Sequence, residues 1–102
     1  MKTKMGVKLE GLNIKMRPVL MAADKIYKQF GQEVVITCTT GSIHSAGSLH
    51  YYGYAIDLRS RYFDDFTLKK VVANLQNQLG QSYNVIAESD HIHVEYDKAK
   101  EL

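Results

Sequence analysis

The chain has 102 residues, of which 45% are hydrophobic and 24% are charged, and its formal net charge is +2. This length suits one domain with a modest core, and we expect a single domain over residues 1–102. The net charge is too small to indicate a nucleic-acid partner. No apolar run is long enough to span a bilayer, and no apolar segment follows the basic N-terminal residues. We therefore expect neither membrane insertion nor a signal peptide.

The N-terminal part of the chain predicts one helix between a basic tail and a strand. Residues 1–5 form the short basic tail. Apolar residues recur at helical spacing over 16–30. Pro18 suits the first turn of this helix, and Gly31 suits the position just after it. Residues 33–39 are rich in Val, Ile and Thr, which favours a strand.

The only cysteine, Cys38, lies in this predicted strand and excludes an internal disulfide. It alternates with Val35 and Ile36 in an apolar run. We expect a buried and inert thiol, with a nucleophile as the less favoured alternative.

The rest of the chain predicts a second strand, a second helix and a hairpin. These elements are expected as a loop at 40–49, a strand at 53–58, a helix at 67–79, strands at 84–87 and 91–96, and a turn at 88–90. Thr67 is a suitable N-cap for the helix, and Gly80 is a suitable stop. The order helix, strand, strand, helix, strand, strand predicts a small α+β domain with an antiparallel sheet and two main helices.

Two separated motifs hold the residues with useful chemistry. Residues 48–57 read SLHYYGYAID and contain His50 and Asp57. Residues 89–94 read SDHIHV and contain Asp90, His91 and His93. Two imidazoles and a carboxylate are ligands that Zn²⁺ accepts in catalytic sites, with a fourth position left for water. The second motif leaves one acid and one histidine beside such a metal as candidates for moving protons.

The neighbours of these residues support a shared site. Asp57 lies between apolar residues in its predicted strand, so its carboxylate needs a partner, and a metal is a good one. Alternation in the last strand divides its side chains between two faces. One face looks like core and holds Ile92, Val94 and Tyr96. The open face holds His91, His93 and Glu95.

The pattern Ser-x-His-x-x-Gly-x-Ala-x-Asp, followed by Asp-x-x-His with an overlapping His-x-His, resembles the M15 family of zinc D-Ala-D-Ala peptidases. That family belongs with lysostaphin-type peptidases and the hedgehog zinc domain. The resemblance extends over residues 16–96 and is strongest to small phage-encoded members of the endolysin type. It implies a hedgehog/D-Ala-D-Ala peptidase-like fold and one Zn²⁺ ion held by His50, Asp57 and His93.

The resemblance also implies roles for the neighbouring residues. Asp90 occupies the position of the general base, where many relatives have Glu. His91 matches the first histidine of the His-x-His pair, which in relatives lies beside the reacting carbonyl. Whether Asp90 or His91 is the general base stays open. No covalent enzyme intermediate is needed, which fits the lack of a credible Ser or Cys nucleophile.

Substrate binding departs from the family pattern. Relatives often carry a Ser-Gly-x-Arg element before the first metal histidine, and its arginine binds the substrate carboxylate. Here residues 39–45 read TTGSIHS and contain no arginine. His44, Ser48 and Arg59 are the substitutes that we expect, with Arg61 as a further candidate.

The expected function is a zinc metallopeptidase that cleaves the stem peptide of bacterial peptidoglycan. The bond is either the D-Ala-D-Ala bond of a carboxypeptidase or the L-alanyl-D-glutamate bond of an endopeptidase. The absence of a signal peptide suits a monomeric phage lysis enzyme or virion component, made in the cytoplasm and active on the cell wall. A non-catalytic hedgehog-like zinc-binding module and a metal-dependent nuclease are the alternatives. Asp90 and His91 favour an enzyme, and the low net charge disfavours a nuclease.

Overall fold

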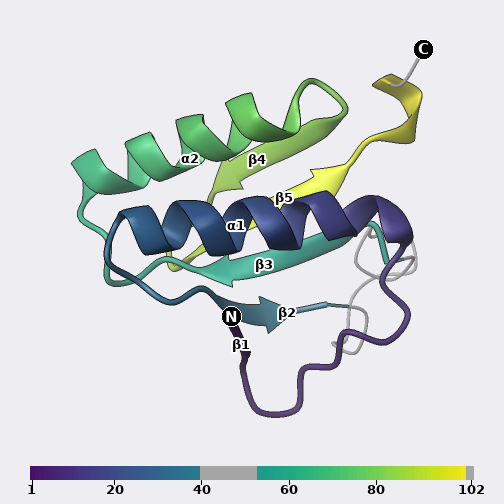
Figure 1. Ribbon diagram of the computed structural model, residues 1–102, viewed down its shortest axis with the longest axis horizontal. Helices are drawn as coiled ribbons and strands as arrows, with labels where there is room; N and C mark the ends of the chain where they lie inside the picture. Colours follow the sequence, from purple (N-terminus) through teal and green to yellow (C-terminus); the bar gives the residue numbers. More distant parts are fainter. Residues whose placement is uncertain (40–52, 101–102) are drawn as a thin grey trace.

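The computed structural model describes residues 1–39 and 53–100. Within these ranges, two helices lie against one face of a five-stranded sheet (Figure 1). The helices and strands are β1 (Lys2–Thr3), α1 (Arg17–Gln29), β2 (Val35–Cys38), β3 (Ala55–Arg59), α2 (Asp65–Leu79), β4 (Tyr83–Ala87) and β5 (His91–Tyr96). Short 3-10 helices over Ile14–Met16 and Lys98–Lys100 precede α1 and follow β5. The arrangement confirms the predicted small α+β domain with two main helices.

The sheet is mixed, whereas the sequence predicts an antiparallel one. Its strand order is β1-β2-β3-β5-β4, and only β1 pairs in parallel, with β2. The backbone N–H groups of Lys2 and Lys4 donate to the carbonyl oxygens of Val34 and Ile36, both at 2.9 Å. The basic tail therefore contributes an edge strand. Because backbone hydrogen bonds form this strand, no side-chain pattern predicts it.

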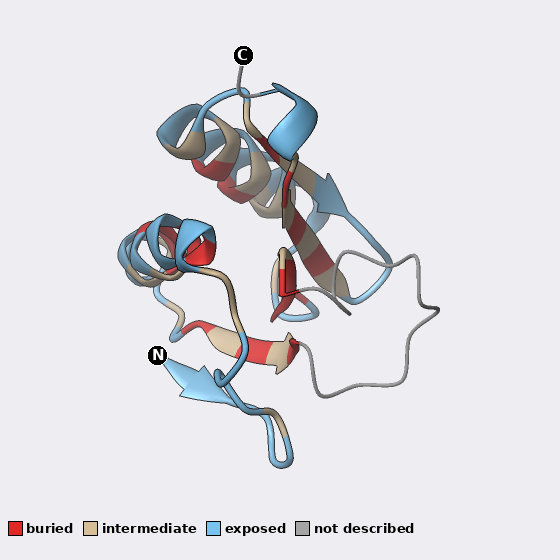
Figure 2. Ribbon diagram, turned by 90° about the vertical axis from the view of Figure 1, so that its right-hand side faces the viewer, coloured by how far each residue is buried: buried red, intermediate tan, exposed pale blue. Residues whose placement is uncertain are grey.

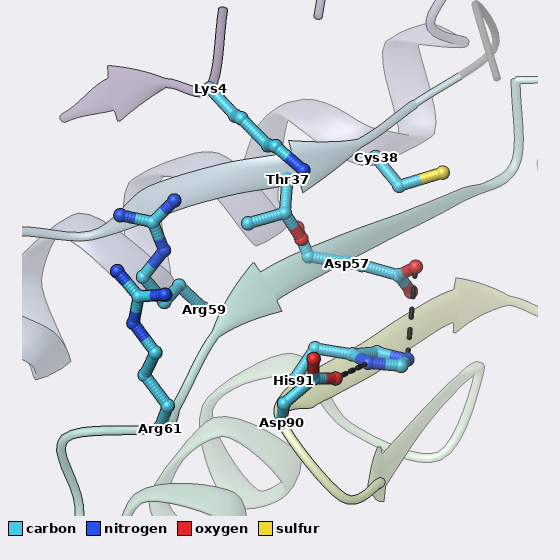
Figure 3. Close-up of a pocket in the computed structure, with 8 residues that line it drawn as sticks. All are labelled: Lys4, Thr37, Cys38, Asp57, Arg59, Arg61, Asp90 and His91. Carbon is cyan, nitrogen blue, oxygen red and sulfur yellow. Dashed lines mark hydrogen bonds and ion pairs between the residues drawn. The ribbon is translucent and has the colours of Figure 1, made fainter.

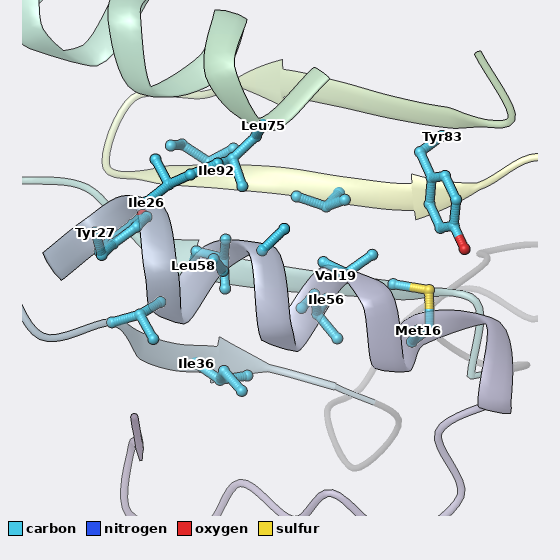
Figure 4. Packing of buried hydrophobic residues seen from close by; sticks show 14 of the residues in the cluster. Met16, Val19, Ile26, Tyr27, Ile36, Ile56, Leu58, Leu75, Tyr83 and Ile92 are labelled. Carbon is cyan, nitrogen blue, oxygen red and sulfur yellow. The ribbon is translucent and has the colours of Figure 1, made fainter. Parts of the chain in front are cut away.

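The core lies between the sheet and the two helices (Figures 2 and 4). The buried residues of α1 follow the predicted helical spacing, and they are Val19, Ala22, Ala23, Ile26 and Tyr27. The sheet contributes its helix-facing side chains, namely Ile36, Ile56, Leu58, Ile92 and Val94. Pro18 lies in the first turn of α1, and Gly31 follows the helix with a φ of +78°, so both predicted helix ends are confirmed.

Helix α2 begins earlier than the sequence predicts. Its N-cap is Asp64 instead of Thr67, because the Asp64 carboxylate accepts a hydrogen bond from the Thr67 backbone N–H at 2.7 Å. Thr67 therefore lies inside the first turn, while the end of the helix before Gly80 is confirmed. The apolar residues of α2 recur at helical spacing and pack on the core, and they are Leu68, Val71, Val72, Leu75 and Leu79. In the described ranges, no helix combines the length and apolar character needed to cross a membrane.

The β4–β5 hairpin confirms the predicted alternation. The turn is closed by the Glu88 backbone N–H, which donates to the His91 carbonyl oxygen at 2.8 Å. The core-facing residues of β5 are buried, and they are Ile92, Val94 and Tyr96. The half-buried residues on the opposite face are His91, His93 and Glu95. The strands thus present polar side chains on the face of the sheet that the helices leave uncovered.

Gly53 allows a close contact between two backbone segments just before β3. Its φ of +79° lies in the left-handed region that favours glycine. A Cβ atom here would lie 2.3 Å from the backbone oxygen of Gly11. The Gly53 carbonyl oxygen also accepts a hydrogen bond from the Asn13 N–H at 3.0 Å. This glycine therefore allows the N-terminal segment to pack closely against the start of the strand that contains Asp57.

We predict that Gly53→Ala destabilises the fold much more than Gly31→Ala, the matched control. Both glycines have positive φ, but a Cβ at Gly31 would meet no atom within 4 Å. Backbone strain alone should cost Gly31→Ala about 1–2 kcal/mol. Overpacking against the Gly11 carbonyl should add roughly 1–3 kcal/mol for Gly53→Ala. Urea unfolding of both variants measures the difference, and equal losses would contradict the close approach.

Candidate functional site

The site is built on a cross-strand pair between β3 and β5. Asp57 lies directly opposite His93 in the sheet register. Asp57 Oδ1 is 3.0 Å from His93 Nδ1, and Asp57 is only 9% exposed. Burying a carboxylate without a partner is costly, and the imidazole supplies that partner. The expectation that Asp57 needs a partner in a buried strand is confirmed, and His93 is one such partner.

A second carboxylate contacts the other nitrogen of His93. Glu95 Oε1 lies 2.8 Å from His93 Nε2, so a carboxylate faces each ring nitrogen. The hydrogen bond to Asp57 raises the pKa of His93 above its usual value; burial opposes this shift, and the hydrogen bond to Glu95 adds to it. The two carboxylates therefore favour the protonated ring, which can donate from both nitrogens.

Glu95 is itself fixed by a chain of hydrogen bonds. The side-chain amide of Asn84 donates to Glu95 Oε2 at 3.0 Å, and Lys100 Nζ donates to Asn84 Oδ1 at 2.6 Å. The sequence places Glu95 on the open face but gives it no role. The signal that could have identified it is its position two residues after His93 in a strand. Asn84 could not be found in this way, because its position depends on the pairing of β4 with β5.

His91 and Asp90 form a second group beside Asp57. His91 Nδ1 is 2.8 Å from Asp90 Oδ1, and His91 Nε2 is 3.8 Å from Asp57 Oδ2. The hydrogen bond from His91 holds the pKa of the exposed Asp90 carboxyl below its usual value. Asp90 is therefore an ionised carboxylate that is open to solvent, and it fixes one nitrogen of His91. The pair combines a proton acceptor with an imidazole that can donate or accept.

These groups line a cavity of about 230 Å³ on the open face of the sheet (Figure 3). Its lining comes from several elements and consists of Lys4, Thr37, Cys38, Asp57, Arg59, Arg61, Asp90 and His91. Carboxylates and an imidazole thus share one small cavity with three cationic side chains. Such a mixture suits a ligand that carries both positive and negative groups.

Cys38 reaches this cavity because the register of β2 shifts. Ile36 pairs with Leu58, but Cys38 pairs with Asp57, so a bulge lies between Ile36 and Cys38. Directly opposite residues share a face of the sheet, which puts Cys38 on the side of Asp57. The prediction of a buried thiol is confirmed. Cys38 nevertheless lies outside the main hydrophobic cluster and lines the cavity instead.

The structure brings together most, but not all, of the predicted site residues. Asp57 contacts His93, and it shares the cavity with Asp90, His91 and Arg59. The predicted residues His44, Ser48 and His50 lie outside the described residues. In the part of the chain that is described, no three His, Cys, Asp or Glu side chains are grouped so that they could hold a metal ion. The described portion of the predicted ligand set is therefore the Asp57–His93 pair.

Comparisons of the chain with protein-family models, curated proteins and solved structures found no match. The resemblance of the two motifs to zinc peptidases therefore stays a prediction. The case for a function rests on the geometry of the residues themselves.

We predict that Asp57→Asn lowers the pKa of His93 in the metal-free protein. The folded pKa is raised above the ordinary value of 6.5, chiefly by the Asp57 hydrogen bond. This interaction should stabilise the fold below pH 6.5, and its contribution should be lost as the pH rises through the folded pKa. NMR titration of the His93 ring measures the pKa. Asp24→Asn, which removes a carboxylate on α1, is the control and should leave it unchanged.

Proposed function

We propose that the chain is a zinc-dependent peptidase that hydrolyses a peptide bond of the stem peptide in bacterial peptidoglycan. The observation that carries this proposal is the pair of donor atoms on Asp57 and His93, 3.0 Å apart beside the Asp90–His91 pair. The hedgehog/D-Ala-D-Ala peptidase-like version of the α+β fold is part of the same proposal. So are a phage-type lysis role, action on the cell wall after synthesis in the cytoplasm, and a monomeric state.

The described donors fit a zinc ion in chemistry and spacing. Carboxylate oxygen and imidazole nitrogen are both common zinc ligands, and two such donors around a tetrahedral ion lie roughly 3.3 Å apart. The 3.0 Å between Asp57 Oδ1 and His93 Nδ1 is close to this value. Glu95 leaves the Nδ1 atom of His93 available, because it accepts from Nε2. His50 is proposed as the third ligand from its motif.

When bound, zinc would act as a Lewis acid that polarises a carbonyl group and makes water more acidic. Asp57 Oδ1 and His93 Nδ1 would hold the ion, so any proton shared by these two atoms would be released on binding. Glu95 would accept from the other N–H of His93 and fix the orientation of the ring.

Asp90 and His91 supply the proton transfers in this proposal. Asp90 is ionised and exposed beside the cavity, so it can accept a proton from the attacking water and return it to the leaving amine. His91 Nδ1 is engaged by Asp90, so its Nε2 faces the remaining polar groups of the cavity. A protonated His91 can donate from this atom to the developing oxyanion. A neutral His91 can accept a proton there and act as the base.

The proposal predicts about one zinc ion per chain and hydrolysis of purified peptidoglycan that a chelator stops. Elemental analysis measures the metal, and mass spectrometry of the products identifies the bond. Free D-Ala indicates a carboxypeptidase, and new L-Ala carboxyl ends indicate an endopeptidase. His93→Ala should lose zinc and activity, while the control Asp24→Asn keeps both.

Other outcomes of this experiment would favour the alternatives. Zinc binding without hydrolysis of any wall peptide would indicate a non-catalytic zinc-binding module. Cleavage of DNA or RNA with an unchanged cell wall would indicate a nuclease. A protein that neither contains zinc nor takes it up would contradict the catalytic proposal directly.

We predict that Asp90→Asn keeps the zinc but loses about 10²–10⁴-fold in rate, the usual effect of removing a positioned base. The amide preserves the shape of the side chain and removes its basicity. Glu88→Gln, an exposed carboxylate change in the same turn, is the matched control and should retain full activity. Retained hydrolysis in Asp90→Asn, together with its loss in His91→Gln, would give the base role to His91.

A further inference from the structure

Strand β4 forms one edge of the sheet and carries no charged side chain. It lies beyond β5 in the strand order, beside α2 (Figure 1), and its residues read YNVIA. Unpaired backbone groups along such an edge can pair with a strand of another molecule. Charged side chains, proline or a covering segment usually prevent this pairing, and β4 contains neither a charge nor a proline. A covering group is the remaining means of protection.

The pairing with β5 determines which backbone groups of β4 face outward. The N–H of Glu88, the residue after β4, donates to the His91 carbonyl oxygen at 2.8 Å. In an antiparallel pair, residues that bond to the partner strand alternate with residues whose groups point away from it. The even-numbered residues of β4 therefore bond to β5. The outward N–H and C=O groups belong to the odd-numbered residues, which are Tyr83, Val85 and Ala87.

The side chain of Gln76 in α2 binds two of these outward groups. Its Nε2 donates to the Tyr83 carbonyl oxygen at 2.7 Å, and its Oε1 accepts from the Val85 N–H at 3.1 Å. One carboxamide thus presents the donor and the acceptor that a neighbouring strand would present. Nε2 also lies 3.0 Å from the Gly80 carbonyl oxygen, which fixes the side chain to the turn between α2 and β4. Gln76 therefore covers the middle of the edge in place of a strand.

An apolar groove lies along the same edge. It has a volume of about 470 Å³ between α2 and β4, and Gln76 is one of its lining residues. The apolar part of the lining consists of Leu68, Val72, Ala73, Val85 and Ala87. A strand paired with β4 would place every second side chain on the groove side of the sheet, where apolar side chains gain from burial. Apolar surface and outward backbone groups thus favour association at the same place.

We propose that Gln76 keeps the chain monomeric by closing the β4 edge against a second copy of the same chain. A second copy fits because antiparallel pairing about Val85 places β4 against itself. Val85 would then lie opposite Val85, and Tyr83 opposite Ala87, so no like charges would meet. This pairing needs the Val85 N–H, which Gln76 occupies. The inference does not depend on the peptidase function and would hold for a protein without zinc.

Gln76→Ala tests the proposal, because it removes the amide and leaves a good helix-forming residue. Size-exclusion chromatography with light scattering should give a monomer for the wild type at every concentration. Gln76→Ala should approach the mass of a dimer as the concentration rises. Gln76→Met keeps the length of the side chain without the amide, so it should associate in the same way even if truncation lowers stability. Gln78→Ala, an exposed change in α2 outside the groove lining, is the matched control and should stay monomeric.

A charge on the edge tests whether the association occurs through β4. Ala87 is exposed at the end of the strand, and its backbone groups face outward. Adding Ala87→Lys to Gln76→Ala would put a charge where the partner strand lies, and this double variant should return to a monomer. Association that persists in the double variant would overturn the proposal. So would variants Gln76→Ala and Gln76→Met that are folded and monomeric at every concentration.

Amide hydrogen exchange measures the same edge residue by residue. In dilute Gln76→Ala, the Val85 N–H should exchange about 3- to 10-fold faster than in the wild type, because one hydrogen bond is lost. In concentrated Gln76→Ala, pairing of the strands should protect both Val85 and Ala87. The Asn84 N–H faces β5 and is the internal reference for an intact sheet. Concentrated samples in which the mass rises but Val85 and Ala87 stay unprotected would place the contact elsewhere and overturn the proposal.

Discussion

The buried contact between Asp57 and His93 is the constraint on which the site depends. Asp57 is almost fully buried on β3, and a carboxylate in such a place must have a partner of opposite charge or several donors. His93 provides that partner from the neighbouring strand. Removing His93 would take one partner away from a buried carboxylate, which costs more than losing a surface ion pair. The same two donor atoms are the ones that a metal ion would use, so one geometry serves both the metal-free fold and the proposed zinc centre.

Side chains alternate between the two faces of the sheet, and this alternation links the Asp57–His93 contact to the packing of the core. In β5, Ile92 and Val94 are fully buried against the helices, while His91 and His93 lie on the open face of the sheet, where His91 lines the cavity. A slip of one residue in the pairing would exchange these two sets, so burial of the apolar residues enforces the position of the histidines. The Tyr27 hydroxyl extends the connection, because it reaches from α1 to the carbonyl oxygen of Arg59. The stability of the core and the geometry of the site are therefore coupled, and changes in the core side of β3 or β5 should disturb both.

Sequence reasoning succeeds here where the signal is periodic and local. Helical spacing predicts α1 and the apolar face of α2, and period-two alternation predicts the two faces of β5. It fails where a structural feature depends on long-range backbone pairing. The strand β1 has two residues and no side-chain pattern, so its parallel pairing with β2 is invisible in the sequence. For the same reason the sequence gives no hint that Lys4 lines the cavity. The bulge that turns Cys38 toward Asp57 and the Asn84–Glu95 contact also depend on strand register. The prediction of the N-cap of α2 is wrong for a different reason. Asp64 and Thr67 both have side chains that can cap a helix, and only the folded geometry shows that Asp64 does so.

The distribution of charge in the cavity bears on the reaction that we propose. Cleavage of a peptide bond ahead of a free α-carboxylate releases an amino acid whose amine becomes positive and whose carboxylate is negative. The cavity has the complementary arrangement, with the ionised Asp90 on one side and Arg59 and Arg61 on the other (Figure 3). Cleavage of a phosphodiester would instead release a phosphate monoester, which is a dianion near neutral pH, and a neutral hydroxyl group, so neither new group is a cation that Asp90 could bind. The mixed charge of one small cavity therefore suits the proposed peptide hydrolysis, and it is a more direct argument than the weak net charge of the chain.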